Sequence, residues 1–342
     1  RKGWKNLRKQ QPSSTPMPRC ANTAAGKALP YANDGGLGKF SRHRCFNTPI
    51  SRDLMRDADT REIGRKIANC ALNLKAQVLL QEGFSPEVNL KAANVCNTRL
   101  CPFCEWRRTR VWRKRLYDGL GALYGDHPKL SGVFLTLTVR NPALEDLSYT
   151  LDEMNRAWCR LINRSFFPTE YWFRRTEITV SANAHTGALS AHPHFHALLL
   201  VKPSYWAKNY VKQLTWQQQW MDSARLDYVP VVDVRRAKQK SASGSSSSGD
   251  ALSSVVEAAK YAAKATALME LGDAISEFHW QIRGKRLYSV SKALNRYIKS
   301  GDVSAEELMD NDSKPLPQGA EVIDVCARWF EDTSEYLITE LA

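Results

Sequence analysis

Three histidines at every second position of residues 191–201, AHPHFHALLLV, restrict most strongly what this chain can fold into. Side chains alternate between the two faces of a strand, so His192, His194 and His196 should share one face. Two neutral imidazoles about 6 to 7 Å apart along a strand can bind one divalent cation together. The pattern predicts a metal site at His194 and His196. His192 has three possible roles: a further ligand, a donor that orients a ligand, or a substrate contact.

A second strand should supply a third ligand. Residues 171–180, YWFRRTEITV, are aromatic and β-branched, and residues 183–187, NAHTG, are typical of a turn. A hairpin that closes symmetrically around this turn places Glu177 opposite His194, whereas an odd-length loop would break the pairing and leave Glu177 solvated. Two imidazoles and a carboxylate leave open positions on the cation, and oxygen donors there suit Mg²⁺ or Mn²⁺.

The net charge of +14 over 342 residues is unevenly distributed. Residues 301–342 hold 11 acidic and two basic residues, a net charge of −9, so residues 1–300 carry +23. A body this basic predicts a nucleic-acid partner, and generic solubility charge is the alternative. We also expect the acidic tail to mask the basic body.

No apolar run reaches the roughly 18 residues of a membrane span, so we expect a cytoplasmic protein without a membrane partner.

The eight cysteines include a cluster with metal-ligand spacing. Cys96, Cys101 and Cys104 follow the pattern C-x₄-C-P-x-C, and a structural zinc site needs four such ligands. We expect Cys70 as the fourth ligand, within a helix that starts near residue 60, with Cys45 as the substitute. A set of reduced, buried thiols without metal is the alternative.

A strongly basic helix should follow the cysteines. Residues 105–116, EWRRTRVWRKRL, place Thr109, Trp112 and Leu116 at the spacing of a core-facing stripe. The arginines between them should reach DNA phosphates, with a merely solvated basic face as the alternative. The expected contacts are Arg107, Arg108, Arg110, Arg113 and Arg115.

The strand at residues 171–180 offers a second candidate DNA surface. Single-stranded DNA is bound by basic grooves lined with aromatic rings. We expect Trp172, Phe173, Arg174 and Arg175 to form such a groove, with core packing as the alternative for the two aromatic side chains.

A helix over residues 251–269 carries a candidate nucleophile. Glu257, Tyr261 and Lys264 stand at i, i+4 and i+7 and therefore share one face. A tyrosine can attack a metal-bound phosphate when a nearby cation stabilises the developing charge, as Lys264 can. Glu257 can act as a general base. A half-buried tyrosine beside an ordinary ion pair is the alternative.

These elements predict an α+β fold with an antiparallel sheet. We expect four regions: a disordered basic arm at residues 1–58, a zinc-binding module with its basic helix at 59–118, a main domain at 119–300 with a Ser/Gly insertion at 240–250, and the acidic tail at 301–342.

Residues 70–290 resemble the plasmid rolling-circle replication initiators of the HUH endonuclease superfamily, in the branch with one tyrosine, one glutamate and a cysteine cluster. The resemblance rests on FLTLTVRN at 134–141, HPHFH at 192–196, the E-x₃-Y-x₂-K motif from Glu257, and the cysteine cluster. The Ser/Gly insertion and the acidic tail match no part of that pattern.

The resemblance implies a sheet of about five antiparallel strands with the histidines on a central strand. It also implies that Tyr261 nicks one strand at a plasmid origin, is joined to the 5′ phosphate and leaves a 3′ hydroxyl. Mg²⁺ or Mn²⁺ would be bound by His194 and His196. Glu257 would promote hydrolysis at termination. A host helicase and DNA polymerase would be partners in the bacterial or archaeal cytoplasm.

Three rival functions remain open at this point. A relaxase or single-tyrosine transposase would share the chemistry on different DNA. A zinc-dependent DNA-binding regulator would bind DNA without covalent capture, and a metal-dependent hydrolase would use water in place of Tyr261.

Overall fold

The computed structural model describes residues 37–81, 87–182, 186–237, 265–299, 301–304, 307–308 and 321–341. The chain divides into two units, each with its own sheet. The larger unit comprises residues 46–71 and 93–311, and the smaller comprises residues 1–45, 72–92 and 312–342.

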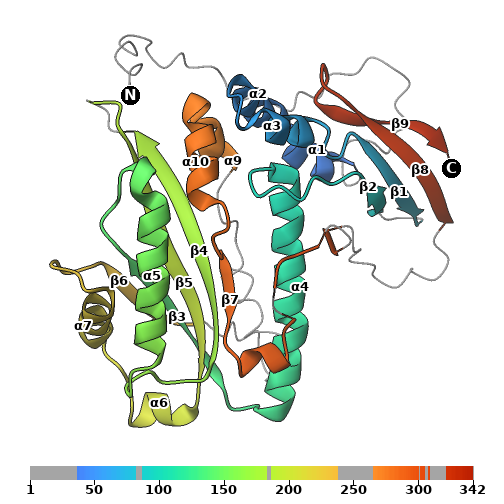
Figure 1. Cartoon of the computed structure of the whole chain (residues 1–342). Coiled ribbons are helices and arrows are strands. Elements are labelled where there is room, and N and C mark those ends of the chain that lie inside the picture. Colours follow the sequence, from blue (N-terminus) through green and yellow to red (C-terminus); the bar gives the residue numbers. More distant parts are fainter. Residues whose placement is uncertain are drawn as a thin grey trace. The chain divides into compact units, whose positions relative to one another are not determined.

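The larger unit is built on a five-stranded antiparallel sheet with the order β6-β3-β5-β4-β7 (Figure 1). Its strands are β3 (Ser131–Thr138), β4 (Tyr171–Ala182), β5 (Leu189–Val201), β6 (Val232–Arg236) and β7 (Tyr288–Val290). The histidine-bearing strand is β5, at the centre of the sheet. The predicted α+β class with five antiparallel strands is therefore confirmed.

The hairpin of β4 and β5 has the predicted register. Glu177 pairs with His194, and the same register runs from Tyr171 paired with Leu200 to Ala182 paired with Leu189. A shift of one residue would have moved every side chain to the opposite face. The alternation of the two strands thus determines which groups can meet on the histidine face.

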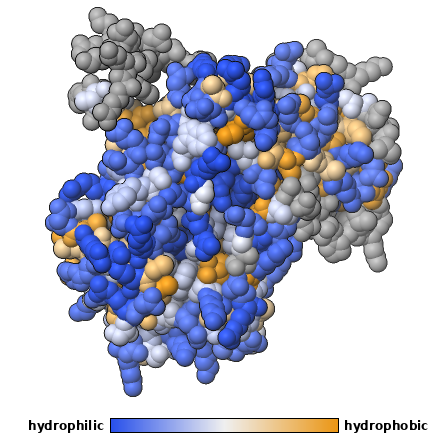
Figure 2. All heavy atoms as spheres, viewed as in Figure 1, coloured by the Kyte–Doolittle hydropathy of each residue, from blue (hydrophilic) through white to orange (hydrophobic). Residues whose placement is uncertain are grey.

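Two helices cover the face of the sheet opposite the histidines (Figure 1). They are α5 (Leu147–Ile162) and α7 (Gln213–Ala224). Trp158, Trp216 and Trp220 from these helices are almost fully buried against apolar strand residues, and burial of one large apolar side chain stabilises a fold by roughly 2 to 3 kcal/mol. Figure 2 shows mostly hydrophilic residues over the outer side of α5, so its apolar stripe faces the sheet.

The basic helix is α4 (Pro102–Asp126), which begins at a proline in its first turn. Its predicted core stripe is confirmed, because Thr109, Trp112 and Leu116 are buried. The Trp112 ring stacks on Tyr288 of β7 with ring centroids 4.9 Å apart. The predicted division between residues 118 and 119 falls inside this continuous helix. Near its end, a Cβ on Gly119 would come within 2.7 Å of the Tyr297 carbonyl oxygen, so a larger residue there would push the two segments apart.

Short helices complete the larger unit. They are α2 (Asn47–Arg56), α3 (Arg61–Ala68), α6 (Pro203–Ala207), α9 (Ala265–Met269), α10 (Ile275–Ile282) and three 3₁₀ turns at Leu144–Asp146, Gly272–Ala274 and Leu294–Arg296. Part of the predicted disordered arm is thus helical. Ile50 and Leu54 are fully buried in α2, so this stretch has the apolar stripe that its polar composition concealed.

The smaller unit contains the four-stranded sheet β2-β1-β8-β9. Its elements are α1 (Gly38–Arg44), β1 (Asn73–Leu80), β2 (Glu87–Ala93), β8 (Glu321–Phe330) and β9 (Glu335–Leu341). The end of the predicted acidic tail therefore forms two strands. In β8, Val325, Ala327 and Trp329 are buried and alternate with more exposed residues. None of the helices in the described ranges has the length and apolar composition that a membrane span needs.

Candidate active site and metal sites

The three histidines of β5 share one partly exposed face, as predicted. Burial alternates along the strand, with His192, His194 and His196 partly exposed and Pro193 and Phe195 buried between them. The His194 and His196 ring centroids lie 6.2 Å apart. Both imidazoles are therefore accessible from the same side.

Glu177 joins this face from β4. Its Oε2 atom lies 3.1 Å from His196 Nε2, although its partner across the strands is His194. A hydrogen bond from His196 lowers the pKa of Glu177, against the effect of burial and with help from Arg175. Burial, then the nearby His196, lowers the pKa of His194. The site thus favours an ionised Glu177 carboxylate and a neutral His194 imidazole, the protonation states that metal ligands require.

Thr136 of β3 completes the surroundings of His196 and was not expected from the sequence. Its Oγ1 lies 3.1 Å from His196 Nδ1 and can donate or accept a hydrogen bond there. Such a contact fixes the ring orientation while Nε2 faces Glu177. The sequence alone gave no register between Thr136 and His196, which pair across β3 and β5 in the structure.

The residues fit a divalent cation of the magnesium or manganese type. Two imidazoles and one carboxylate share an accessible face, Glu177 lies beside His196, and Thr136 contacts the other nitrogen of the His196 ring. His192 Nε2 instead lies 2.6 Å from Ser181 Oγ. Metal binding by His194, His196, Glu177 and His192 stays a prediction.

Arg174 and Arg175 do not line a groove. Their side chains are 2% and 1% exposed. Arg174 lies 3.9 Å from the Phe195 ring centroid and donates to Asn155 Oδ1 at 2.6 Å, and burial lowers its pKa to about 9. Arg175 Nη2 is 3.7 Å from Glu177 Oε2.

The neighbouring aromatic residues are packed as well. Phe173 is fully buried, and the partly buried Trp172 makes an edge contact with Trp158. Strand β4 is covered on both faces, by α5 on one and by Trp112 of α4 on the other. In this structure, the expectation of a DNA groove at these four residues is therefore replaced by core packing.

The four predicted zinc ligands come together in a compact cluster. Their sulfur atoms all lie within 4.8 Å of one another, with Cys70 and Cys104 3.5 Å apart and Cys96 and Cys104 3.7 Å apart. Tetrahedral zinc–thiolate bonds of about 2.3 Å place neighbouring sulfurs at about 3.8 Å. The cluster, consisting of Cys70, Cys96, Cys101 and Cys104, could hold a metal ion such as zinc.

Local backbone structure builds this cluster. Cys70 lies in the turn after α3 and not in a helix, and Ala71 beside it has a positive φ of 54°. Cys101 caps the start of α4, and Cys104 lies in its first turn. Burial raises the pKa of Cys101, whereas hydrogen bonds from its thiol neighbours lower the pKa of Cys96. Four thiols so close cannot all ionise unless a cation neutralises them.

The arginines of α4 differ widely in exposure. Arg107 and Arg108 are buried, Arg110 is half-buried and Arg113 is exposed. The Arg115 side chain is 8% exposed. Only Arg113 among the five predicted phosphate contacts is thus openly available in this conformation.

The predicted nucleophile and its neighbours lie outside the described residues. Glu257, Tyr261 and Lys264 all precede Ala265, where α9 begins. Their roles remain expectations from the sequence.

Residues 87–337 match the Rep_1 family, described as a replication protein. A protein rep from Lactiplantibacillus plantarum is 32% identical over 260 residues, which cover 71% of this chain and 79% of the relative. Two Bacillus relatives, both named protein rep, are 36% identical, but the match spans only about half of their length, 55% and 49%. No solved structure matches the chain.

Proposed function

Because this chain belongs to the Rep_1 family of replication proteins, we propose that it initiates rolling-circle replication of a plasmid. In this proposal it nicks one strand at the origin and stays joined to the 5′ phosphate through a tyrosine. The observation that carries the proposal is the register of β4 and β5, which brings Glu177 to the accessible imidazoles of His194 and His196.

The metal site would prepare the scissile phosphate. A divalent cation bound there supplies Lewis-acid polarisation of a phosphoryl oxygen. His194 and His196 would provide nitrogen ligands, and Glu177 would provide the charged oxygen ligand. Thr136 keeps the His196 ring in one orientation, and the buried charge of Arg175 favours the ionised form of Glu177.

Tyr261 would perform the strand transfer. Its phenolic oxygen forms the new bond to phosphorus, and the bond from phosphorus to the 3′ oxygen breaks, which leaves a 3′ hydroxyl after protonation. Lys264 would stabilise the charge on the phenolic oxygen. Glu257 would accept a proton from water when the phosphotyrosine bond is hydrolysed at termination. The phosphotyrosine retains the energy needed to rejoin strands.

The partners follow from this chemistry. The substrate would be origin DNA, double-stranded before the nick and locally single-stranded at it. A host helicase and a DNA polymerase would use the strand end released by the nick. The relatives come from bacteria, which supports a bacterial host.

The two ends of the nick test the proposal. Purified protein is incubated with Mn²⁺ and a supercoiled plasmid that carries its cognate origin, with the same plasmid lacking the origin as the control. We expect open circles only with the origin, a 3′ end that DNA polymerase extends, and a 5′ end that resists phosphatase followed by polynucleotide kinase because it is joined to protein. A 5′ end that is free from the start would show hydrolysis by water and overturn the proposal.

A further inference from the structure

The start of the predicted acidic tail lies along α4 and contacts its basic side chains. We call residues 301–304 and 307–308 the acidic segment. Asp302 Oδ1 is 3.0 Å from Arg99 Nη2, just before α4. Glu307 Oε1 is 2.6 Å from Arg115 Nη2, and Arg107 Nε donates to the Leu308 carbonyl. The segment thus places acceptors on Arg107 and Arg115 of α4 and on Arg99 just before it.

Glu307 is the centre of these contacts. It also pairs with Lys299 at 3.0 Å, and its side chain is 21% exposed. Burial raises the pKa of Glu307, but hydrogen bonds from Arg115, from the Ser304 backbone and from Lys299 outweigh it and lower the pKa to about 2. Glu307 is therefore ionised at any physiological pH.

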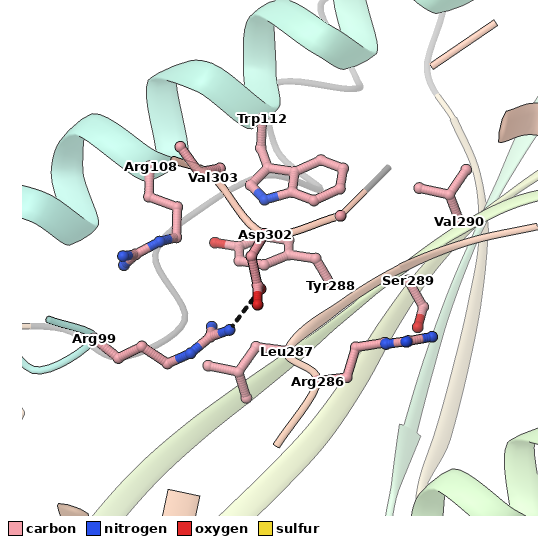
Figure 3. Close-up of a pocket in the computed structure, with 11 residues that line it drawn as sticks. Arg99, Arg108, Trp112, Arg286, Leu287, Tyr288, Ser289, Val290, Asp302 and Val303 are labelled. Carbon is pink, nitrogen blue, oxygen red and sulfur yellow. Dashed lines mark hydrogen bonds and ion pairs between the residues drawn. The ribbon is translucent and has the colours of Figure 1, made fainter. Parts of the chain in front are cut away.

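Asp302 stands at an arginine-lined pocket (Figure 3). The cavity measures about 180 Å³, and Arg99, Arg108 and Arg286 contribute to its walls. Figure 3 shows the Asp302 carboxylate directed at Arg99. The Asp302 side chain is 92% exposed, so solvent screens its ion pair with Arg99 and the pair contributes little free energy.

The three pocket arginines differ in how completely the fold pairs their charges. Arg108 donates to Glu105 at 2.6 Å and to Asn97 at 2.7 Å, so its charge is satisfied within the fold. Arg286 is exposed, and no carboxylate in the described part of the chain pairs with it. The pocket therefore keeps a positive potential that Asp302 only partly cancels.

Carboxylates and phosphates bind guanidinium groups in the same way, through charge-assisted N–H···O bonds. We propose that the acidic segment mimics the DNA backbone. Asp302 and Glu307 pair with Arg99 and Arg115 in the absence of DNA, and these two arginines contact DNA phosphates once DNA displaces the segment. This inference rests on the proposed function, since DNA is the competing ligand. Nonspecific DNA would be held off by the segment, and binding at the origin would supply the free energy to displace it.

A purely structural role for the segment predicts something different. Ser304 and Glu307 exchange hydrogen bonds in the manner of a helix cap, with Glu307 N donating to Ser304 Oγ and Ser304 N donating to Glu307 Oε2. Asn97 also donates to the Val303 carbonyl. If these contacts serve only to stabilise the fold, loss of the carboxylates should lower the melting temperature without tighter DNA binding.

The test compares charge-matched variants. Asp302→Asn, Glu307→Gln and the double variant are titrated against a fluorescent single-stranded oligonucleotide of unrelated sequence, at about 50 to 200 mM salt. The control is Asp273→Asn, which removes one charge from an exposed ion pair with Arg56 at 2.9 Å. Circular dichroism and thermal melting verify that each variant is folded.

We expect the double variant to bind about tenfold tighter than wild type at low salt. Its affinity should also fall more steeply with salt concentration, by the slope that about one to two additional phosphate contacts produce. The control should stay within about twofold of wild type. Addition of Arg115→Met to the double variant should remove most of the gain. An equal gain in the control, or no gain in the double variant, overturns the inference.

Failure of this inference and failure of the proposed function give different results. If wild type forms a covalent adduct with origin DNA but the double variant binds no tighter, only the inference fails. If the double variant binds tighter but no form makes an adduct, the initiator proposal fails and the phosphate-binding surface remains. If no form makes an adduct and the double variant binds no tighter, both the initiator proposal and the inference about the acidic segment fail.

Discussion

The cysteine cluster and the histidine face are two candidate metal sites in the same unit, built in opposite ways. The cluster has four ligands of one kind, and three of them, Cys70, Cys101 and Cys104, are buried. The histidine face has two imidazoles and a carboxylate on an accessible sheet surface. A closed set of four thiolates leaves no position for a substrate, whereas three donors leave several. The difference separates a site that stabilises the fold from one that can perform chemistry.

The largest effect should come from breaking the closed site. Cys101→Ser removes a ligand from the fully buried start of α4, so we expect loss of bound zinc and a fall in unfolding free energy of about 3 kcal/mol or more. Metal content by mass spectrometry and denaturant unfolding measure both quantities. Cys159→Ser, an exposed free cysteine, is the control and should change neither. Full stability of Cys101→Ser would mean that the thiols bind no structural metal.

The open site should show the reverse pattern. His194→Ala should reduce origin nicking about 100-fold or more, because the loss of one ligand displaces the cation that polarises the phosphate. Its unfolding free energy should change by less than about 1 kcal/mol, because the ring is partly exposed. His127→Ala, a histidine away from this face, should nick normally. A stability loss as large as that of Cys101→Ser would erase the distinction between the sites.

The pH dependence of Mn²⁺ binding tests the predicted ligands of the histidine face. The lowered pKa of His194 keeps its imidazole neutral at pH 7, and the lowered pKa of Glu177 keeps its carboxylate ionised. Protonation of His194 should therefore not oppose Mn²⁺ binding at neutral pH, and it should weaken the affinity only below the ordinary pKa of 6.5. Titration calorimetry from neutral to mildly acidic pH measures this. A loss of affinity that begins above pH 7 would contradict the predicted ligand set.

The smallest effect should come from the support of His196. Thr136→Val removes the hydroxyl beside His196 Nδ1 while keeping the side-chain shape, so nicking should fall about tenfold with stability nearly unchanged. Thr138→Val is the matched control, because its hydroxyl donates to the Val231 carbonyl and not to a histidine. Equal losses in both variants would show that Thr136 does not orient the ring.

Periodicity predicted the parts of the site that depend on local structure. Alternation along β4 and β5, together with the turn between them, was enough to place Glu177 opposite His194. Cysteine spacing was enough to bring Cys101 and Cys104 together, because both lie at the start of one helix.

Properties that depend on packing were not predictable in this way. The burial of Arg174 and Arg175 depends on helices that cover both faces of β4, and these come from distant parts of the sequence. The acidic tail was predicted from its net charge alone, and this overlooked the apolar alternation of Val325, Ala327 and Trp329 that forms β8. Glu307 could not be assigned to Arg115 because 192 residues separate them.

The central claim is that Tyr261 attacks a phosphate positioned by the histidine face. A denaturing gel of protein incubated with Mn²⁺ and a labelled single-stranded oligonucleotide carrying the cognate origin tests it most directly. Wild type and the control Tyr210→Phe, an exposed tyrosine, should form a 5′-linked covalent adduct, and Tyr261→Phe should form none. An adduct that persists in Tyr261→Phe, or cleavage without an adduct in wild type, would contradict the account.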